Sequence, residues 1–211
     1  MRFFSLLILF AAPIFLPAAP ISLGQGLAFE RVHKLPADLP TSGPAKKEAV
    51  ILDLRYVQTD DAGAAAFSAW LSFRTTSLPA FILVNTKTSP LLVRALKARP
   101  EPPGVVTLGP ALADFTPDIA LKISPDVEQR AYNAFEHGAS LDSLITEKVD
   151  KRRYDESALV KAHVSDTQAQ PEEDEPAAAK PKSPPPLVDL TLQRAVQLHR
   201  ALLALHKLPS A

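Results

Sequence analysis

The sequence predicts an α/β domain with a mainly parallel sheet and flanking helices. Short, almost wholly apolar segments alternate with longer segments in which apolar residues recur at helical spacing. This alternation is typical of parallel strands that helices cover on both faces. The chain has 211 residues, 46% of them hydrophobic, so it can bury the core of one domain. It contains no cysteine, so no disulfide stabilises that core.

Four segments are predicted to form the strands. Residues 49–54 and 80–84 are apolar except for Asp53, which is the pattern of strands buried on both faces. Residues 105–108 and 119–123 are also short and mainly apolar, and turn residues precede both. We therefore expect them to extend the same sheet.

Three helices are predicted in the same region. The first, residues 62–73, follows an Asp-Asp pair at 60–61 that can cap it, and its apolar residues recur at helical spacing. The second runs from Pro90 to Ala98 with Ser89 as its N-cap. The third begins at a Ser-Pro-Asp sequence and ends at Gly138, a typical C-terminal stop.

The first 28 residues have the layout of a cleavable signal peptide. One basic residue precedes an apolar run, and small residues follow, so that cleavage after Gly24 or Ala28 fits the pattern. The alternative is an uncleaved anchor, but the run is short for the ~20 residues that a membrane span requires. We expect an exported protein, periplasmic or extracellular, with no stable membrane span after cleavage.

The chain beyond the signal peptide divides into three parts. Residues 29–165 are the predicted α/β domain. Residues 166–186 contain six prolines, an acidic run and no aromatic residue, so we expect a disordered linker. Residues 187–211 predict an amphipathic helix that docks on the domain, either of the same chain or of a neighbour. The apolar face of that helix consists of Leu192, Ala195, Val196, His199, Leu202 and Leu203.

Charge and motif content exclude several classes of function. Lys plus Arg and Asp plus Glu number 23 each, which argues against electrostatic nucleic-acid binding. There is no glycine-rich phosphate loop, and the five histidines are scattered, so no cofactor and no metal are predicted. Asp53 and Arg55 follow each other closely at a strand end. They predict either a structural ion pair or a ligand site, and the ion pair is favoured because buried charges usually pair.

Five motifs in a fixed order resemble the protease core of the tail-specific (C-terminal-processing) serine proteases. A strand ends in Leu-Asp-Leu-Arg, a second in Leu-Val-Asn and a third in Val-Val-Thr-Leu-Gly; a strand that begins with Pro-Asp-Ile and an Asp-x-x-Leu-x-x-Ala helix follow. They lie at Leu52–Arg55, Leu83–Asn85, Val105–Gly109, Pro117–Ile119 and Asp189–Ala195. The resemblance covers about residues 46–208. It implies the crotonase-like layered fold of that family.

The nucleophile of this family lies just after the Val-Asn sequence. In this chain Ser89 is the nearest candidate, and Thr88 is the second. A serine before a proline is also a preferred helix N-cap, and this structural interpretation is favoured over the catalytic one. A nucleophilic serine needs a base. The family uses a lysine after the third strand, but this chain has no lysine between Lys97 and Lys122.

The oxyanion loop of the family departs as well. The resemblance implies a glycine-rich turn after Arg55, but only Gly63 follows, and acidic residues at 60–61 lie where negative charge develops. The sequence therefore predicts a pseudoprotease that has lost its catalytic dyad and oxyanion loop. Its partner would be a peptide or another exported protein. The alternative is an active serine-type peptidase that uses Ser89.

Overall fold

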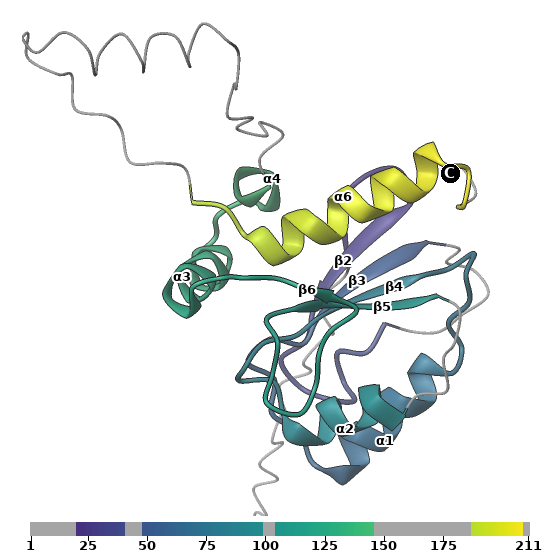
Figure 1. Ribbon diagram of the computed structural model, residues 1–211, viewed down its shortest axis with the longest axis vertical. Coiled ribbons are helices and arrows are strands. Elements are labelled where there is room, and N and C mark those ends of the chain that lie inside the picture. Colours follow the sequence, from purple (N-terminus) through teal and green to yellow (C-terminus); the bar gives the residue numbers. More distant parts are fainter. Residues whose placement is uncertain (1–19, 41–47, 99–103, 146–186, 209–211) are drawn as a thin grey trace, which may run out of the picture. The chain divides into compact units, whose positions relative to one another are not determined.

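The computed structural model describes residues 20–40, 48–98, 104–145 and 187–208 (Figure 1). The chain divides into two compact units, the first of residues 1–122 and 194–211 and the second of residues 123–193. A six-stranded sheet in the order β1-β2-β3-β4-β5-β6 forms the first unit. The predicted α/β class with a mainly parallel sheet is confirmed, because only β1 runs antiparallel to its neighbour.

The strands are short and follow one another across the sheet in chain order. Their bounds are β1 Ile21–Ser22, β2 Leu27–Arg31, β3 Ala49–Asp53, β4 Ala80–Leu83, β5 Val105–Gly109 and β6 Ile119–Ala120. The last four correspond to the predicted strands, although β6 ends earlier than expected. Every residue of β2, β3 and β4 is buried, which explains why β3 and β4 are such continuous apolar segments.

The first two strands lie partly within the segment that we assigned to the signal peptide. Leu27 and Ala28 belong to β2, are 2% and 7% exposed, and pair with β3. Cleavage after Ala28 would remove both residues, and cleavage after Gly24 would remove β1. The folded domain thus begins before residue 29. Residues 1–19, which carry the apolar run, lie outside the described residues.

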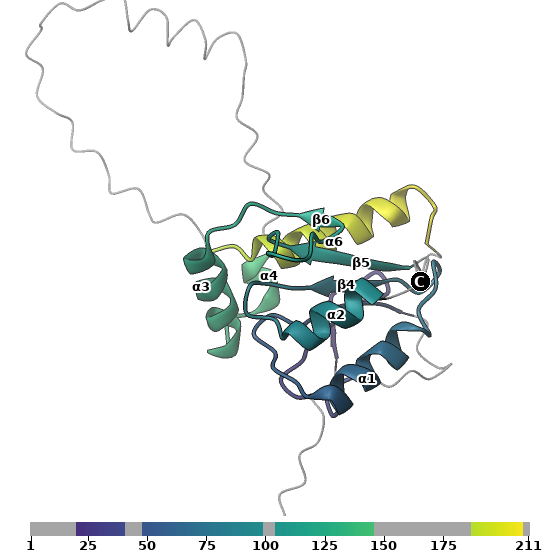
Figure 2. The same cartoon turned by 60° about the horizontal axis from the view of Figure 1, so that its bottom comes forward.

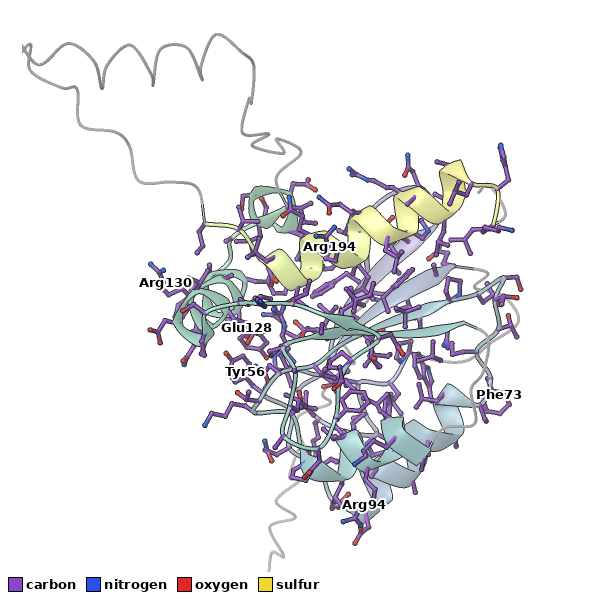
Figure 3. All side chains as sticks on the ribbon, viewed as in Figure 1. Tyr56, Phe73, Arg94, Glu128, Arg130 and Arg194 are labelled. Atoms are coloured by element: carbon purple, nitrogen blue, oxygen red, sulfur yellow. The ribbon has the colours of Figure 1, made fainter. Side chains whose placement is uncertain are left out.

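Helices α1 (Asp61–Leu71) and α2 (Pro90–Ala98) pack on the same face of the sheet (Figure 2). Asp60 caps α1, because its carboxylate accepts a hydrogen bond of 2.8 Å from the Gly63 N–H. Phe73, the last residue of the predicted helix, lies beyond the end of α1 and is 68% exposed (Figure 3). Between the helices and the sheet lies a core that includes Val50, Leu52, Leu54, Phe67, Trp70, Ile82, Val84, Leu92 and Leu96.

The opposite face of the sheet presents the alternate residues of each strand. Phe29, Ile51 and Phe81 are neighbours in the strand register, and each is nearly inaccessible to solvent. Helix α6 (Leu190–Ala204) contributes its part from Arg194 onward to this unit, on the side away from α1 and α2 (Figure 2). The ring of His199 contacts Phe81 edge-on at 6.2 Å between centroids. In this structure, the α6 residues from Arg194 onward therefore belong to the same unit as the sheet.

The described part of the second unit contains α3 (Pro125–Glu136), α4 (Leu141–Leu144) and the first residues of α6. Asp189 caps α6 by accepting a hydrogen bond of 3.0 Å from the Leu192 N–H. The Asp189 N–H in turn donates to the Leu144 carbonyl, which joins α4 to the start of α6. The predicted linker at 166–186 lies outside the described residues. No helix in the described part of the chain is long and apolar enough to cross a membrane.

Candidate functional site

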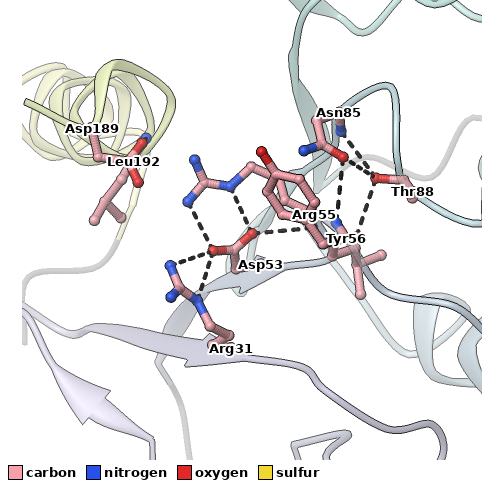
Figure 4. Close-up of polar contacts among 9 residues, drawn as sticks. Arg31, Asp53, Arg55, Tyr56, Asn85, Thr88, Asp189 and Leu192 are labelled. Atoms are coloured by element: carbon pink, nitrogen blue, oxygen red, sulfur yellow. Dashed lines mark hydrogen bonds and ion pairs between the residues drawn. The ribbon is translucent and has the colours of Figure 1, made fainter. Parts of the chain in front are cut away.

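A buried ion cluster lies at the carboxyl ends of β2 and β3. Both guanidinium nitrogens Nε and Nη2 of Arg31 donate to Asp53 Oδ2, at 3.1 and 3.0 Å (Figure 4). Arg55 donates from Nε to Oδ1 and from Nη2 to Oδ2, both at 2.8 Å. Asp53 and Arg55 are 0% exposed and Arg31 is 6% exposed. The ion pair of Asp53 and Arg55 that the sequence favoured is present.

The strand register explains why these charges meet. Arg31 pairs directly with Asp53 across β2 and β3, so both side chains point to the same face of the sheet. Burial by itself would raise the pKa of Asp53, but the charge and hydrogen bonds of Arg55, together with the charge of Arg31, lower it below its ordinary value. Asp53 is therefore ionised in the folded protein.

Arg31 is the member of this cluster that the sequence did not reveal. It follows closely on the segment assigned to the signal peptide, and no apolar pattern marked β2 as a strand. Without that strand, its register with Asp53 could not be inferred. The charged Glu30-Arg31 pair at the end of an apolar stretch was the available signal.

The turn after β4 is held by two of its own side chains. The Asn85 N–H donates to Thr88 Oγ1 at 2.9 Å, and the Lys87 N–H donates to Asn85 Oδ1 at 3.0 Å. The Thr88 N–H donates to the Asn85 carbonyl at 3.1 Å. Asn85 and Thr88 are 1% and 6% exposed. This turn is therefore fixed by hydrogen bonds shielded from water.

Four hydrogen bonds join this turn to the turn that follows β3. Tyr56, whose φ of 64° is left-handed, donates its N–H to Asn85 Oδ1 at 3.3 Å. The Ser89 N–H donates to the Val57 carbonyl at 2.9 Å. The other two run from Thr88 Oγ1 to the Leu54 carbonyl and from Gln58 Nε2 to the Lys87 carbonyl, at 3.1 and 2.7 Å. The two turns are thus closed against each other.

Hydrogen bonds within the chain occupy the backbone N–H groups of residues 55–57 and 87–89. The Arg55 N–H donates to Asp53 Oδ1 and the Val57 N–H to the Leu54 carbonyl. With the bonds above, every backbone N–H of residues 55–57 and 87–89 has an acceptor within the chain. An oxyanion hole requires N–H groups that are aimed at the substrate instead. Residues 55–57 and 87–89 offer no such pair in this conformation.

Ser89 lies immediately before α2 and is 2% exposed. Its carbonyl accepts the Val93 N–H at 3.1 Å, as expected of a residue that begins a helix. Among the described residues, no lysine or histidine makes a hydrogen bond with its hydroxyl. Lys97 is in the last turn of α2, about 12 Å along the helix at 1.5 Å per residue. The hydroxyl of Thr88, the second candidate, is held between Asn85 and Leu54.

The remaining candidates and the comparisons add no further site. No group of His, Asp and Glu residues in the described ranges could hold a metal ion, and His163 lies outside those ranges. None of the protein-family models matches the chain, and no curated protein matches it in sequence.

Proposed function

We propose that this chain is an exported binding or accessory protein without peptidase activity, built on a core that resembles that of the tail-specific serine proteases. The observation that carries the proposal is the closure of the turns after β3 and β4. In a protease of this type, these turns would provide the oxyanion donors and the nucleophile. Here the backbone N–H groups of residues 55–57 and 87–89 donate to acceptors within the chain.

The environment of Ser89 supports the same proposal. A serine hydroxyl attacks a carbonyl only when a neighbouring base removes its proton. Ser89 is buried, it precedes a helix, and no lysine or histidine among the described residues forms a hydrogen bond with its hydroxyl. Asp60, which follows the turn after β3, is engaged as the N-cap of α1. The catalytic roles that the resemblance implies therefore have no groups to fulfil them in the described part of the chain.

The partner that fits best is a peptide or protein with a free C-terminal carboxylate. Gln58, Thr86 and Lys87 are exposed at the closed turns, where they offer polar side chains and one positive charge. A carboxylate would be attracted to that charge without any need for catalysis. The tail-specific family, which acts at C-termini, supports the same choice of partner.

The first test is labelling by a serine-directed fluorophosphonate, followed by intact-mass analysis of the protein. We expect no adduct on the wild type, on Ser89→Ala or on Thr88→Ala. The alternative, a peptidase that uses Ser89, requires an adduct on the wild type that is lost in Ser89→Ala. That result would overturn the proposal.

The second test measures binding by fluorescence anisotropy. Unstructured peptides with a free C-terminus are compared with the same peptides carrying a C-terminal amide. We expect the free carboxylate to bind more tightly, and Lys87→Ala to weaken that binding. Lys97→Ala, at the exposed end of α2, is the matched control and should bind like the wild type. Equal binding of both peptide forms would exclude this class of partner.

A further inference from the structure

His199 is buried where α6 contacts the sheet. Its side chain is 2% exposed, and its ring stands edge-on to Phe81 of β4, with 88° between the ring planes. The residues beside Phe81 in the strand register are Ile51, then Phe29, on one side and Val106 on the other. The imidazole therefore faces a hydrocarbon surface. Within the described residues, neither ring nitrogen has a hydrogen-bond partner.

The charged groups around His199 would not compensate a proton on its ring. On its own helix the neighbour is Arg200, which is also cationic. On this face of β2 and β3 the charged residues are Arg31 and Asp53, and Asp53 is already bonded to two guanidinium groups. β4 and β5 add only Phe81, Leu83, Val106 and Leu108 to this face. In the described part of the chain, no carboxylate forms an ion pair with His199.

Protonation of this ring is therefore unfavourable while α6 is docked. Burial, and secondarily the charge of Arg200, lower the pKa of His199 below the ordinary value of 6.5. A released helix exposes the ring to water and restores the ordinary value. Below about pH 6.5 the released state consequently binds more protons, and its population rises by up to about tenfold per pH unit until the pKa of the docked state is passed.

We propose that protonation of His199 releases the part of α6 from Arg194 onward, so that mild acid uncovers the apolar sheet face formed by Phe29, Ile51 and Phe81. Release of this part of α6 requires no movement within the sheet, because the core between the sheet and helices α1 and α2 contains no residue of α6. The inference is independent of the function proposed above.

Amide hydrogen exchange measured by NMR on the full chain at pH 7.5 and pH 5.0 tests this. Exchange is expressed as protection factors, which correct for the intrinsic effect of pH. Amides of β3 serve as the internal reference for global unfolding. Ordinary carboxylates remain ionised throughout this range, so histidines are the side chains that titrate. We expect protection of residues 195–203 to fall several-fold, and by no more than about thirtyfold, while β3 is unchanged.

Two variants separate His199 from other histidines. His199→Leu keeps an apolar side chain against Phe81 but cannot be protonated, so its α6 should be equally protected at both pH values. His206→Gln alters the exposed histidine beyond the end of the same helix and should behave like the wild type. The proposal is overturned if wild-type α6 is equally protected at both pH values. It is also overturned if the loss persists in His199→Leu, or if β3 loses protection to the same degree.

A direct titration of the His199 ring in the wild type provides a test that does not depend on whether a variant folds. The NMR shift of the His199 ring protons is followed with pH beside that of His206. A pKa of the His199 ring below the ordinary value of 6.5 supports the proposal, and an equal or higher value overturns it.

Discussion

Asp53 holds together the buried charges at the carboxyl ends of β2 and β3. It is fully buried, and two guanidinium groups donate to its carboxylate. Such a buried cluster contributes modestly to net stability, because desolvation of the charges offsets their attraction. Removing one partner is different, since the remaining charges stay buried without their counter-ion. The lowered pKa of Asp53 also sets a pH window. The ionised Asp53 carboxylate stabilises the fold fully at pH values above its ordinary pKa of about 3.8. This stabilisation is lost as the pH falls through the lowered pKa of Asp53 in the folded state.

Asp53→Asn should therefore lower the free energy of unfolding by about 3–5 kcal/mol at pH 7. Urea unfolding followed by circular dichroism measures this change. Asp114→Asn, at an exposed position, is the matched control and should cost less than about 0.5 kcal/mol. The difference between wild type and Asp53→Asn should shrink below pH 4, because the wild-type carboxylate is then protonated in the unfolded state. A cost under 1 kcal/mol at pH 7 would contradict the structural role of the cluster.

Thr88 gives a second prediction at this scale, because its hydroxyl both accepts and donates. Thr88→Val preserves the shape but leaves the buried Asn85 N–H without its acceptor. The free energy of unfolding should fall by about 1–3 kcal/mol. Thr88→Ser should recover most of that loss, and Thr86→Val, in the exposed part of the same turn, should be nearly neutral. Equal effects of Thr88→Val and Thr86→Val would show that the hydroxyl does not close the turns.

The elements differ in how far the sequence could predict them. β3, β4, α1 and α2 were predicted with bounds close to those observed, because β3 and β4 are short, almost wholly apolar runs and the apolar residues of α1 and α2 recur at helical spacing. β1 and β2 were not predicted, since they follow directly on a signal-like apolar segment and β2 ends in two charged residues. The carboxyl ends of β2, β3 and β4 are far apart in sequence, and only the pairing register of the folded sheet brings them together. For this reason the Arg31 contact and the closure of the two turns could not be inferred.

Substitution of Gly63 tests how closely the start of α1 packs against its neighbours. Alanine favours helices over glycine by about 1 kcal/mol, which would predict stabilisation. A Cβ at residue 63, however, would overlap Thr59 Oγ1 and lie 3.0 Å from Leu35 Cβ. Gly63→Ala should thus destabilise the protein by about 1–3 kcal/mol. Thr59→Ala removes the closer atom and should restore part of the loss in the double variant. Stabilisation by Gly63→Ala alone would refute this packing.

At the scale of the whole molecule, the N-terminal boundary of the fold lies earlier than the sequence indicated. β2 is buried throughout and lies between β1 and β3. A chain that starts at residue 29 lacks β1 and the side chain of Leu27. It should be less stable than a chain that starts at Pro20 by at least about 2 kcal/mol, from the burial of Leu27 alone. Thermal and urea unfolding of the two chains, side by side, measure this. Equal stability would place the start of the fold at β2's second half.

Composition predicts the balanced charge, and the pattern of apolar residues predicts the parallel sheet. Neither predicts that the two turns of the candidate site are closed by hydrogen bonds. The sequence showed that a base and a glycine-rich loop are missing at the positions implied by the resemblance. It could not show that Asn85, Thr88 and Val57 would take up the hydrogen bonds of the two turns. Those contacts arise between residues about 30 positions apart, which only the folded sheet brings together.

The central claim is that the turns after β3 and β4 are closed on each other. The most direct test is amide hydrogen exchange, by NMR, at Tyr56 and Ser89, whose N–H groups bond to Asn85 and Val57. The account predicts that both amides are protected to the same degree as those of β3 and β4. Exchange as fast as in an exposed loop would mean that the donors are available to a substrate, and the claim of a closed, non-catalytic edge would be contradicted.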